Sequence, residues 1–136
     1  TMRAFIVELK NEPGSLADLS EALGERGVNI VGVAGMTWNE LGAVGLITNN
    51  DATARAVLEE RDETFREVEL IAAGLEDRAG SLGIAARRLA DRGINIEACM
   101  TTSMLGSKVT IAFAVDDAAA AREALGDLTN LSGASI

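Results

Sequence analysis

Two short stretches decide the fold of this chain, because each of them occurs twice. Gly14-Ser15-Leu16 recurs as Gly80-Ser81-Leu82, and Arg26-Gly27-Val28-Asn29-Ile30 recurs as Arg92-Gly93-Ile94-Asn95-Ile96. Both pairs are offset by the same 66 residues (14 to 80, and 26 to 92). A repeat of this length is longer than the unit of a solenoid and is about as long as a very small domain. The sequence therefore predicts two equivalent halves, which we place at residues 1–69 and 70–136.

The recurring residues predict a turn, a helix and the strand that follows it. Leucines in the first copy are spaced to form an apolar stripe on one helix face: Leu16, Leu19 and Leu23. The second copy offers the equivalent inward-facing set: Leu82, Ala85, Ala86 and Leu89. Gly27 and Gly93 are placed to end these helices, because glycine readily adopts the left-handed conformation just past a helix end.

Apolar runs and turn residues predict the remaining elements. We expect strands at 3–9, 28–36 and 43–48, a helix at 52–61, a strand at 65–73 that serves both halves, strands at 94–102 and 108–115, and a helix from 118 to 125. Hairpin loops are expected at 38–42 and 103–107, and residues 129–136 leave room for a short last strand. Each half then reads βαββαβ. This order favours an α+β fold of ferredoxin-like type, in which an antiparallel sheet carries helices on one face.

Composition narrows the classes of partner. The chain has 136 residues and a formal net charge of −9, which disfavours nucleic acid. It has no apolar run near the roughly 18 residues of a membrane span and no signal-peptide pattern, so we expect no membrane association and a cytoplasmic location. The single Cys99 cannot form an internal disulfide, and we expect it to be a small buried residue on a strand.

Signatures of catalysis are missing. The chain has no histidine, so it offers no Ser–His or Cys–His pair and no common zinc constellation. Its many carboxylates lie on predicted helix faces, where a solvated surface explains them. The run at 32–35 (Gly-Val-Ala-Gly) continues a strand and does not form a phosphate-binding loop. We therefore expect a protein that is not an enzyme, without catalytic residues, cofactor or metal.

The doubled motifs resemble those of the ACT domain family. Its signature is an acidic or Asn-containing turn, Pro-Gly, a hydrophobic residue, a helix, and then Gly-Val/Ile-Asn-Ile. The chain carries Asn11-Glu12-Pro13-Gly14-Ser15-Leu16 with Gly27-Val28-Asn29-Ile30, and Asp77-Arg78-Ala79-Gly80-Ser81-Leu82 with Gly93-Ile94-Asn95-Ile96. The resemblance covers nearly the whole chain. It implies a stand-alone protein of two ACT repeats, a ligand-binding module that regulates amino-acid metabolism. Ala79 departs from the family's proline, and the lack of histidine leaves the identity of the ligand open.

The strand-to-helix turn is the physically favoured place for an anionic group. Unpaired N–H groups at a helix start can bind a carboxylate, and Gly14 and Gly80 let a ligand approach the backbone closely. In the family that the chain resembles, the Asn or Asp three residues before this glycine and the Asn of the second motif contact the ligand. We expect those asparagines to lie close to the turns. The candidate ligand-binding residues are Asn11, Glu12, Gly14, Ser15, Asn29, Asp77, Gly80, Ser81 and Asn95.

Each candidate also has a purely structural explanation. The turn glycines can serve the turn alone, the asparagines of the second motif can bond the local backbone, and Ser15 and Ser81 can simply start helices. Two functions therefore stay open. The first is a regulatory protein that senses an amino acid or a similar small metabolite at a boundary between repeats or chains. The second is an interaction module that dimerises or docks on a partner enzyme or regulator without a ligand. Exposed sheet edges favour a homodimer in either case.

Overall fold

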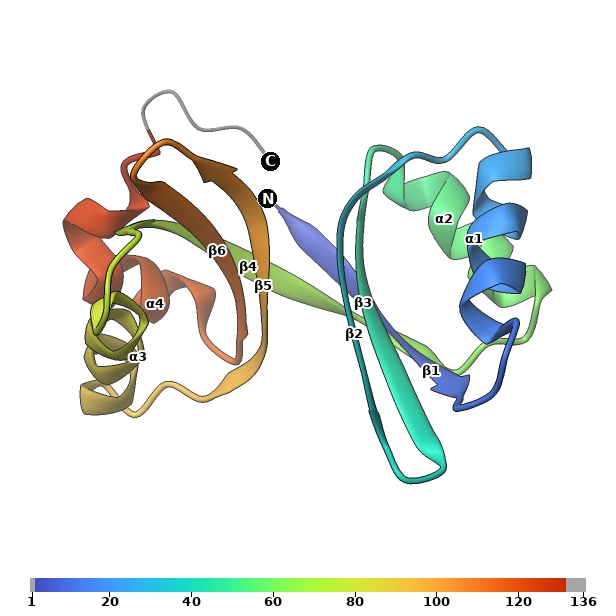
Figure 1. Cartoon of the computed structure of the whole chain (residues 1–136), viewed down its shortest axis with the longest axis horizontal. Coiled ribbons are helices and arrows are strands. Elements are labelled where there is room, and N and C mark those ends of the chain that lie inside the picture. The colour runs from blue at the N-terminus through green and yellow to red at the C-terminus, as the bar shows by residue number, and fades with distance from the viewer. Residues whose placement is uncertain (1, 132–136) are drawn as a thin grey trace. The chain divides into compact units, whose positions relative to one another are not determined.

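A computed structural model describes residues 2–131 of the chain. Within them it contains six β-strands, four α-helices and one short 3-10 helix (Figure 1). The chain divides into two compact units. The N-terminal unit comprises Arg3–Glu67, and the C-terminal unit comprises Met2 and residues 68–131 of the described chain.

The N-terminal unit is an antiparallel sheet with two helices on one face. Its elements are β1 (Arg3–Lys10), α1 (Ser15–Glu25), β2 (Ile30–Trp38), β3 (Leu41–Thr48), α2 (Asp51–Glu60) and the first residues of β4 (Phe65–Glu76). β3 pairs with both β1 and β2. Alternate residues of β1 and β3 face the helices. Their side chains form the core with those of the helices and of Val28, which lies between α1 and β2: Phe5, Val7, Leu19, Leu23, Val28, Val44, Leu46, Ala54, Val57 and Leu58.

The C-terminal unit repeats this arrangement. β4 is followed by α3 (Ser81–Asp91), β5 (Ile96–Leu105), β6 (Lys108–Val115), α4 (Ala118–Leu125) and the 3-10 helix Gly126–Thr129. β6 pairs with both β4 and β5, and α3 and α4 cover one face of the sheet (Figure 1). Its core is built from Ile71, Ala73, Leu75, Ala85, Leu89, Ile94, Ile111, Phe113, Val115, Ala121 and Leu125. The predicted α+β fold with helices on one face of an antiparallel sheet is confirmed.

The two motif helices end as predicted. Gly27 has φ 74° and Gly93 has φ 69°, both in the left-handed region. The amide of Val28 donates to the carbonyl of Leu23 at 3.0 Å, and the amide of Gly27 donates to the carbonyl of Gly24 at 3.0 Å. This pair of bonds is the Schellman motif, which satisfies the last carbonyls of a helix. The amides of Ile94 and Gly93 make the same two bonds in α3.

Three expectations about side-chain burial and loops are wrong. Leu16 and Leu82 are 49% and 50% exposed, so the first turn of each motif helix is not packed into the core. Cys99 is also exposed. It lies on β5, which pairs on one side alone within the described C-terminal unit. The hairpin loops shrink to residues 39–40 and 106–107, because the strands keep pairing almost to the turn.

The end of the chain is described in part. Thr129 ends the 3-10 helix, so the expected last strand does not begin there. Residues 132–136, on which the rest of that prediction falls, lie outside the described residues. Over residues 2–131, every helix is too short or too polar to cross a lipid bilayer.

Candidate functional site

The two strand-to-helix turns have the same backbone geometry. Gly14 has φ 93° and ψ −16°, and Gly80 has φ 92° and ψ −14°. A Cβ atom added at either glycine would find no described atom within 4 Å. Glycine is therefore favoured at these positions by the left-handed backbone conformation and not by steric crowding.

The helices that follow these turns lack a side-chain cap. Asn50 accepts a 3.0 Å bond from the amide of Thr53 at the start of α2, and Asp117 accepts a 3.0 Å bond from the amide of Ala120 at the start of α4. No described side chain caps α1 or α3 in this way. Helix starts carry amides without intrahelical partners and the positive end of the helix dipole, so the first turns of α1 and α3 are suited to an anion.

A cavity of about 380 Å³ lies beside the uncapped start of α1. Its polar and charged lining comes from the end of β1, the turn, the first residue of α1 and β2: Lys10, Asn11, Glu12, Ser15 and Thr37. The rest of the lining is apolar or glycine: Leu9, Leu16, Gly35, Met36, Gly42, Ala43 and Val44. Binding sites for small molecules commonly have this size and this combination of an apolar wall with a few polar groups.

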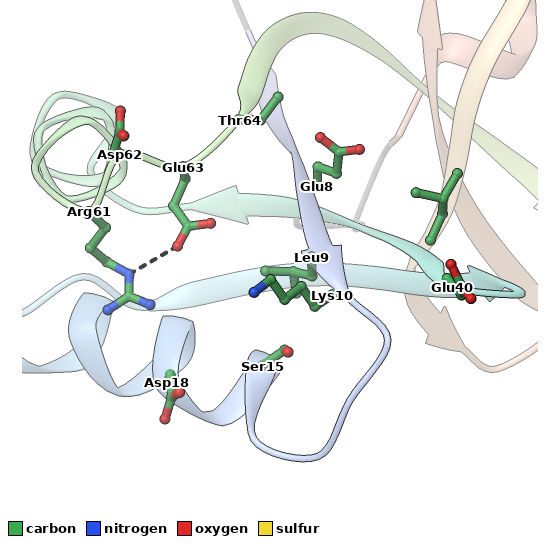
Figure 2. A pocket seen from close by; sticks show the side chains of 11 residues that line it. Glu8, Leu9, Lys10, Ser15, Asp18, Glu40, Arg61, Asp62, Glu63 and Thr64 are labelled. Atoms are coloured by element: carbon green, nitrogen blue, oxygen red, sulfur yellow. Dashed lines mark ion pairs between the residues drawn. The ribbon is translucent and has the colours of Figure 1, made fainter.

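A second cavity, of about 440 Å³, shares Leu9, Lys10 and Ser15 with the first, and Figure 2 shows the residues that line it. Arg61 and Glu63 both line it and point toward each other, with Nε and Oε1 3.4 Å apart (Figure 2). Its carboxylates come from five residues: Glu8, Asp18, Glu40, Asp62 and Glu63. These carboxylates outnumber the two cationic side chains, Lys10 and Arg61, so binding of a ligand carboxylate is disfavoured here. Sequence reasoning missed this cavity, since its residues come from four separate segments that share no motif.

The residues three positions before the turn glycines tie each turn to the neighbouring hairpin. The side-chain amide of Asn11 donates to the carbonyl of Asn39 at 2.6 Å. In the C-terminal unit, the backbone amide of Asp77 donates to the carbonyl of Ser107 at 2.8 Å. The carbonyl oxygen of the Asn11 side chain takes no part in its bond, so it can still accept from a ligand.

Asn29 and Asn95 lie at the other end of their helices from the turn glycines. α1 and α3 each have 11 residues, which corresponds to roughly 16 Å of helix. The amide of Asn29 donates to Oδ1 of Asn49 at 2.9 Å, and that of Asn95 donates to Oδ1 of Asp116 at 3.3 Å. The expected closeness of these asparagines to the turns is therefore wrong within either unit.

Surface ion pairs lower the pKa of three carboxyl groups outside the 380 Å³ cavity. Hydrogen bonds from Arg55 lower the pKa of Glu67, those from Lys108 lower the pKa of Glu76, and those from Arg88 lower the pKa of Asp127. Each pair joins neighbouring elements, which indicates a structural role. Among residues 2–131, no group of three His, Cys, Asp or Glu side chains is placed to hold a metal ion.

No protein-family model and no curated protein sequence matches this chain. Solved structures do share its fold. The protein BT0572 from Bacteroides thetaiotaomicron matches with a TM-score of 0.76 and 15% identity, over 91% of this chain and 85% of that one. The regulatory subunit of aspartate kinase from Thermus thermophilus, in its ligand-free form, matches with a TM-score of 0.68 and 17% identity, over 93% and 92%. The corresponding subunit from Thermus flavus matches with a TM-score of 0.67 and 17% identity, over 91% and 90%. These likenesses establish the fold.

Proposed function

We propose that this chain is a regulatory small-molecule-binding protein of the ACT type, which senses an amino acid at the strand-to-helix turn. The observation that carries this proposal is the cavity of about 380 Å³ at the uncapped start of α1. Regulatory subunits of aspartate kinase share the fold of this chain, and this supports the control of a partner enzyme as its role.

The lining of the cavity suits a zwitterion. The carboxylate of an amino acid would accept bonds from the first-turn amides of α1 and pair with the ammonium group of Lys10. Its own ammonium group would meet Glu12 and the side-chain oxygen of Asn11. Asn29 and Asn95 would join such a site from a second chain. Binding would stabilise one packing of the turns over another, and so shift the population of states that a partner sees.

A second candidate function is suggested by the hairpin between β2 and β3. Met36, Trp38 and Leu41 are 81%, 79% and 64% exposed, although large apolar side chains favour burial. Such a surface favours an interaction module that forms a homodimer or docks on a partner enzyme without binding a ligand.

A thermal-shift screen against the twenty amino acids tests the first function. A ligand at 100 times its Kd should stabilise the chain by about 2.7 kcal/mol. Glu12→Gln should reduce the shift, whereas Glu21→Gln, which removes the same charge from α1 outside this cavity, should leave it intact. A flat response to every amino acid at millimolar concentration would reject the sensing function. If the chain then self-associates and Trp38→Ser disperses it, the interaction function is supported instead.

A further inference from the structure

Gly35 lies inside β2 without a steric or conformational need for glycine. A Cβ added there would come no closer than 3.8 Å to any described atom, which is an ordinary contact, and its φ is not positive. Gly32 and Gly42 differ, because a Cβ on them would lie 2.9 Å from the Ile47 side chain and from the Leu9 carbonyl oxygen, respectively. A glycine inside a strand often marks a bulge, a bend, or a place where a ligand or another backbone approaches closely.

The missing side chain of Gly35 opens onto the candidate cavity. Gly35 is paired with Val44 of β3, and Val44 belongs to the core between the sheet and the helices. Residues paired across antiparallel strands point to the same face, so a side chain at position 35 would project toward the helices. Gly35, Val44 and Leu16 of α1 all line the cavity of about 380 Å³.

The C-terminal unit has larger residues at the equivalent positions. The register pairs Thr101 with Ile111 as it pairs Gly35 with Val44. Likewise, Val109 is paired with Leu75 as Gly42 is paired with Leu9. Three helix-facing positions of the wall thus change from Gly35, Gly42 and Val44 to the larger residues Thr101, Val109 and Ile111.

The charges at the turn also differ between the units. The repeat offset places Glu76 and Arg78 where the N-terminal unit has Lys10 and Glu12. Glu76 is already engaged by a hydrogen bond from Lys108. Lys10 has an ammonium group that could pair with a ligand carboxylate. Its counterpart Glu76 has a carboxylate, which is already paired with Lys108.

From these differences we infer that the N-terminal unit alone binds the ligand, and that Gly35 selects an amino acid with a short apolar side chain. The inference rests on the proposed function. Lys10 and Glu12 engage the charges common to every amino acid, so the side chain is left to the apolar wall. A charged side chain would have to lose its hydration against Leu16 and Val44 without a partner, which is unfavourable.

Isothermal titration with L-alanine, L-valine, L-leucine, L-aspartate and L-lysine tests this inference. We expect the unchanged chain to bind one apolar amino acid per chain and to bind L-aspartate and L-lysine at least tenfold more weakly. Gly35→Thr, which copies the residue of the C-terminal unit, should weaken binding by roughly tenfold or more, because even one or two extra carbon atoms in a pocket matter this much. The melting temperature should not fall, since threonine favours strands.

Two further variants complete the test. Gly35→Ala adds a single carbon with ordinary contacts and should weaken L-leucine binding more than L-alanine binding. Thr101→Ala, the matched control in the C-terminal unit, should leave binding unchanged. Two ligands per chain, full affinity in Gly35→Thr, or loss of affinity in Thr101→Ala would overturn the inference and leave the proposed function standing. If none of the twenty amino acids binds the unchanged chain, the proposed function fails and this inference fails with it.

Discussion

At the scale of single residues, backbone conformation alone gives two neighbouring glycines opposite roles. Gly24 lies inside α1, and Gly27 follows its end with φ 74°. A Cβ added at either position would meet no described atom within 4 Å. Gly24→Ala should therefore stabilise the protein by up to about 1 kcal/mol, through helix propensity. Gly27→Ala should destabilise it by about 1 to 2 kcal/mol, through left-handed strain. Urea titration of the two variants measures both effects, and a shift of the same sign in both would contradict this explanation.

The sequence pattern predicts the conformation of the helix-ending glycines correctly and the burial of the leucines only in part. The left-handed conformation of Gly27 and Gly93 is predictable, because a glycine just past a helical pattern commonly ends the helix in this conformation. Leu16 has the correct helical spacing, yet it is 49% exposed, because the period of a helix gives the face of a residue and not how closely that face is packed. The expectation that Asn29 lies close to the Gly14 turn fails because the 11 residues of α1 separate the two positions.

At the scale of elements, the four helices start in two ways. α2 and α4 have side-chain caps from Asn50 and Asp117, whereas α1 and α3 begin at a glycine turn. Asn50→Ala and Asp117→Ala should each cost about 1 kcal/mol of stability, because each leaves a first-turn amide without its acceptor. Ser15→Ala is the matched control at an uncapped start and should cost much less. Chemical denaturation of the three variants checks this difference, and an equal loss in Ser15→Ala would show that Ser15 caps α1.

Strand ends were predicted less well than strand existence. The sequence places a five-residue loop at 38–42, but Trp38 and Leu41 remain paired across the hairpin, so the loop has two residues. Pairing extends this far because the residues at the tip are apolar and fit a ladder as well as a loop. Asn39 completes the turn with φ 56°, a conformation that asparagine tolerates better than most residues.

At the scale of the whole molecule, the repeat predicts two similar units and hides how they differ. The offset of 66 residues gave the order of elements in both halves and the positions of both turns. Strand register shows that Gly35 and Thr101 are equivalent, because it pairs them with Val44 and Ile111 on the helix-facing side. Register is set by long-range pairing, so hydrophobic periodicity could not supply it.

Acid should weaken the whole molecule through carboxylates of both units. Hydrogen bonds from Arg55 lower the pKa of Glu67, and hydrogen bonds from Lys108 and Arg88 lower those of Glu76 and Asp127. A carboxyl group with a lowered pKa contributes its full stabilisation above the unfolded pKa, about 4.3 for Glu and 3.9 for Asp. That contribution is lost as the pH falls through the lower folded pKa, because the unfolded chain then binds more protons than the native one. The net charge of −9 acts in the opposite direction, since protonation relieves repulsion.

The free energy of unfolding should therefore change little between neutral pH and about pH 5 and should decline below about pH 4, where these carboxylates protonate. Glu67→Gln tests the ion pair with the most hydrogen bonds of the three, because Arg55 donates to both carboxylate oxygens of Glu67, at 2.7 and 2.5 Å. This variant should lose some stability at neutral pH and show a shallower decline in acid, since it has no carboxyl left to protonate at this position. Urea midpoints measured across this range provide the comparison. Parallel curves for the variant and the unchanged chain would show that the ion pair does not contribute to the acid response.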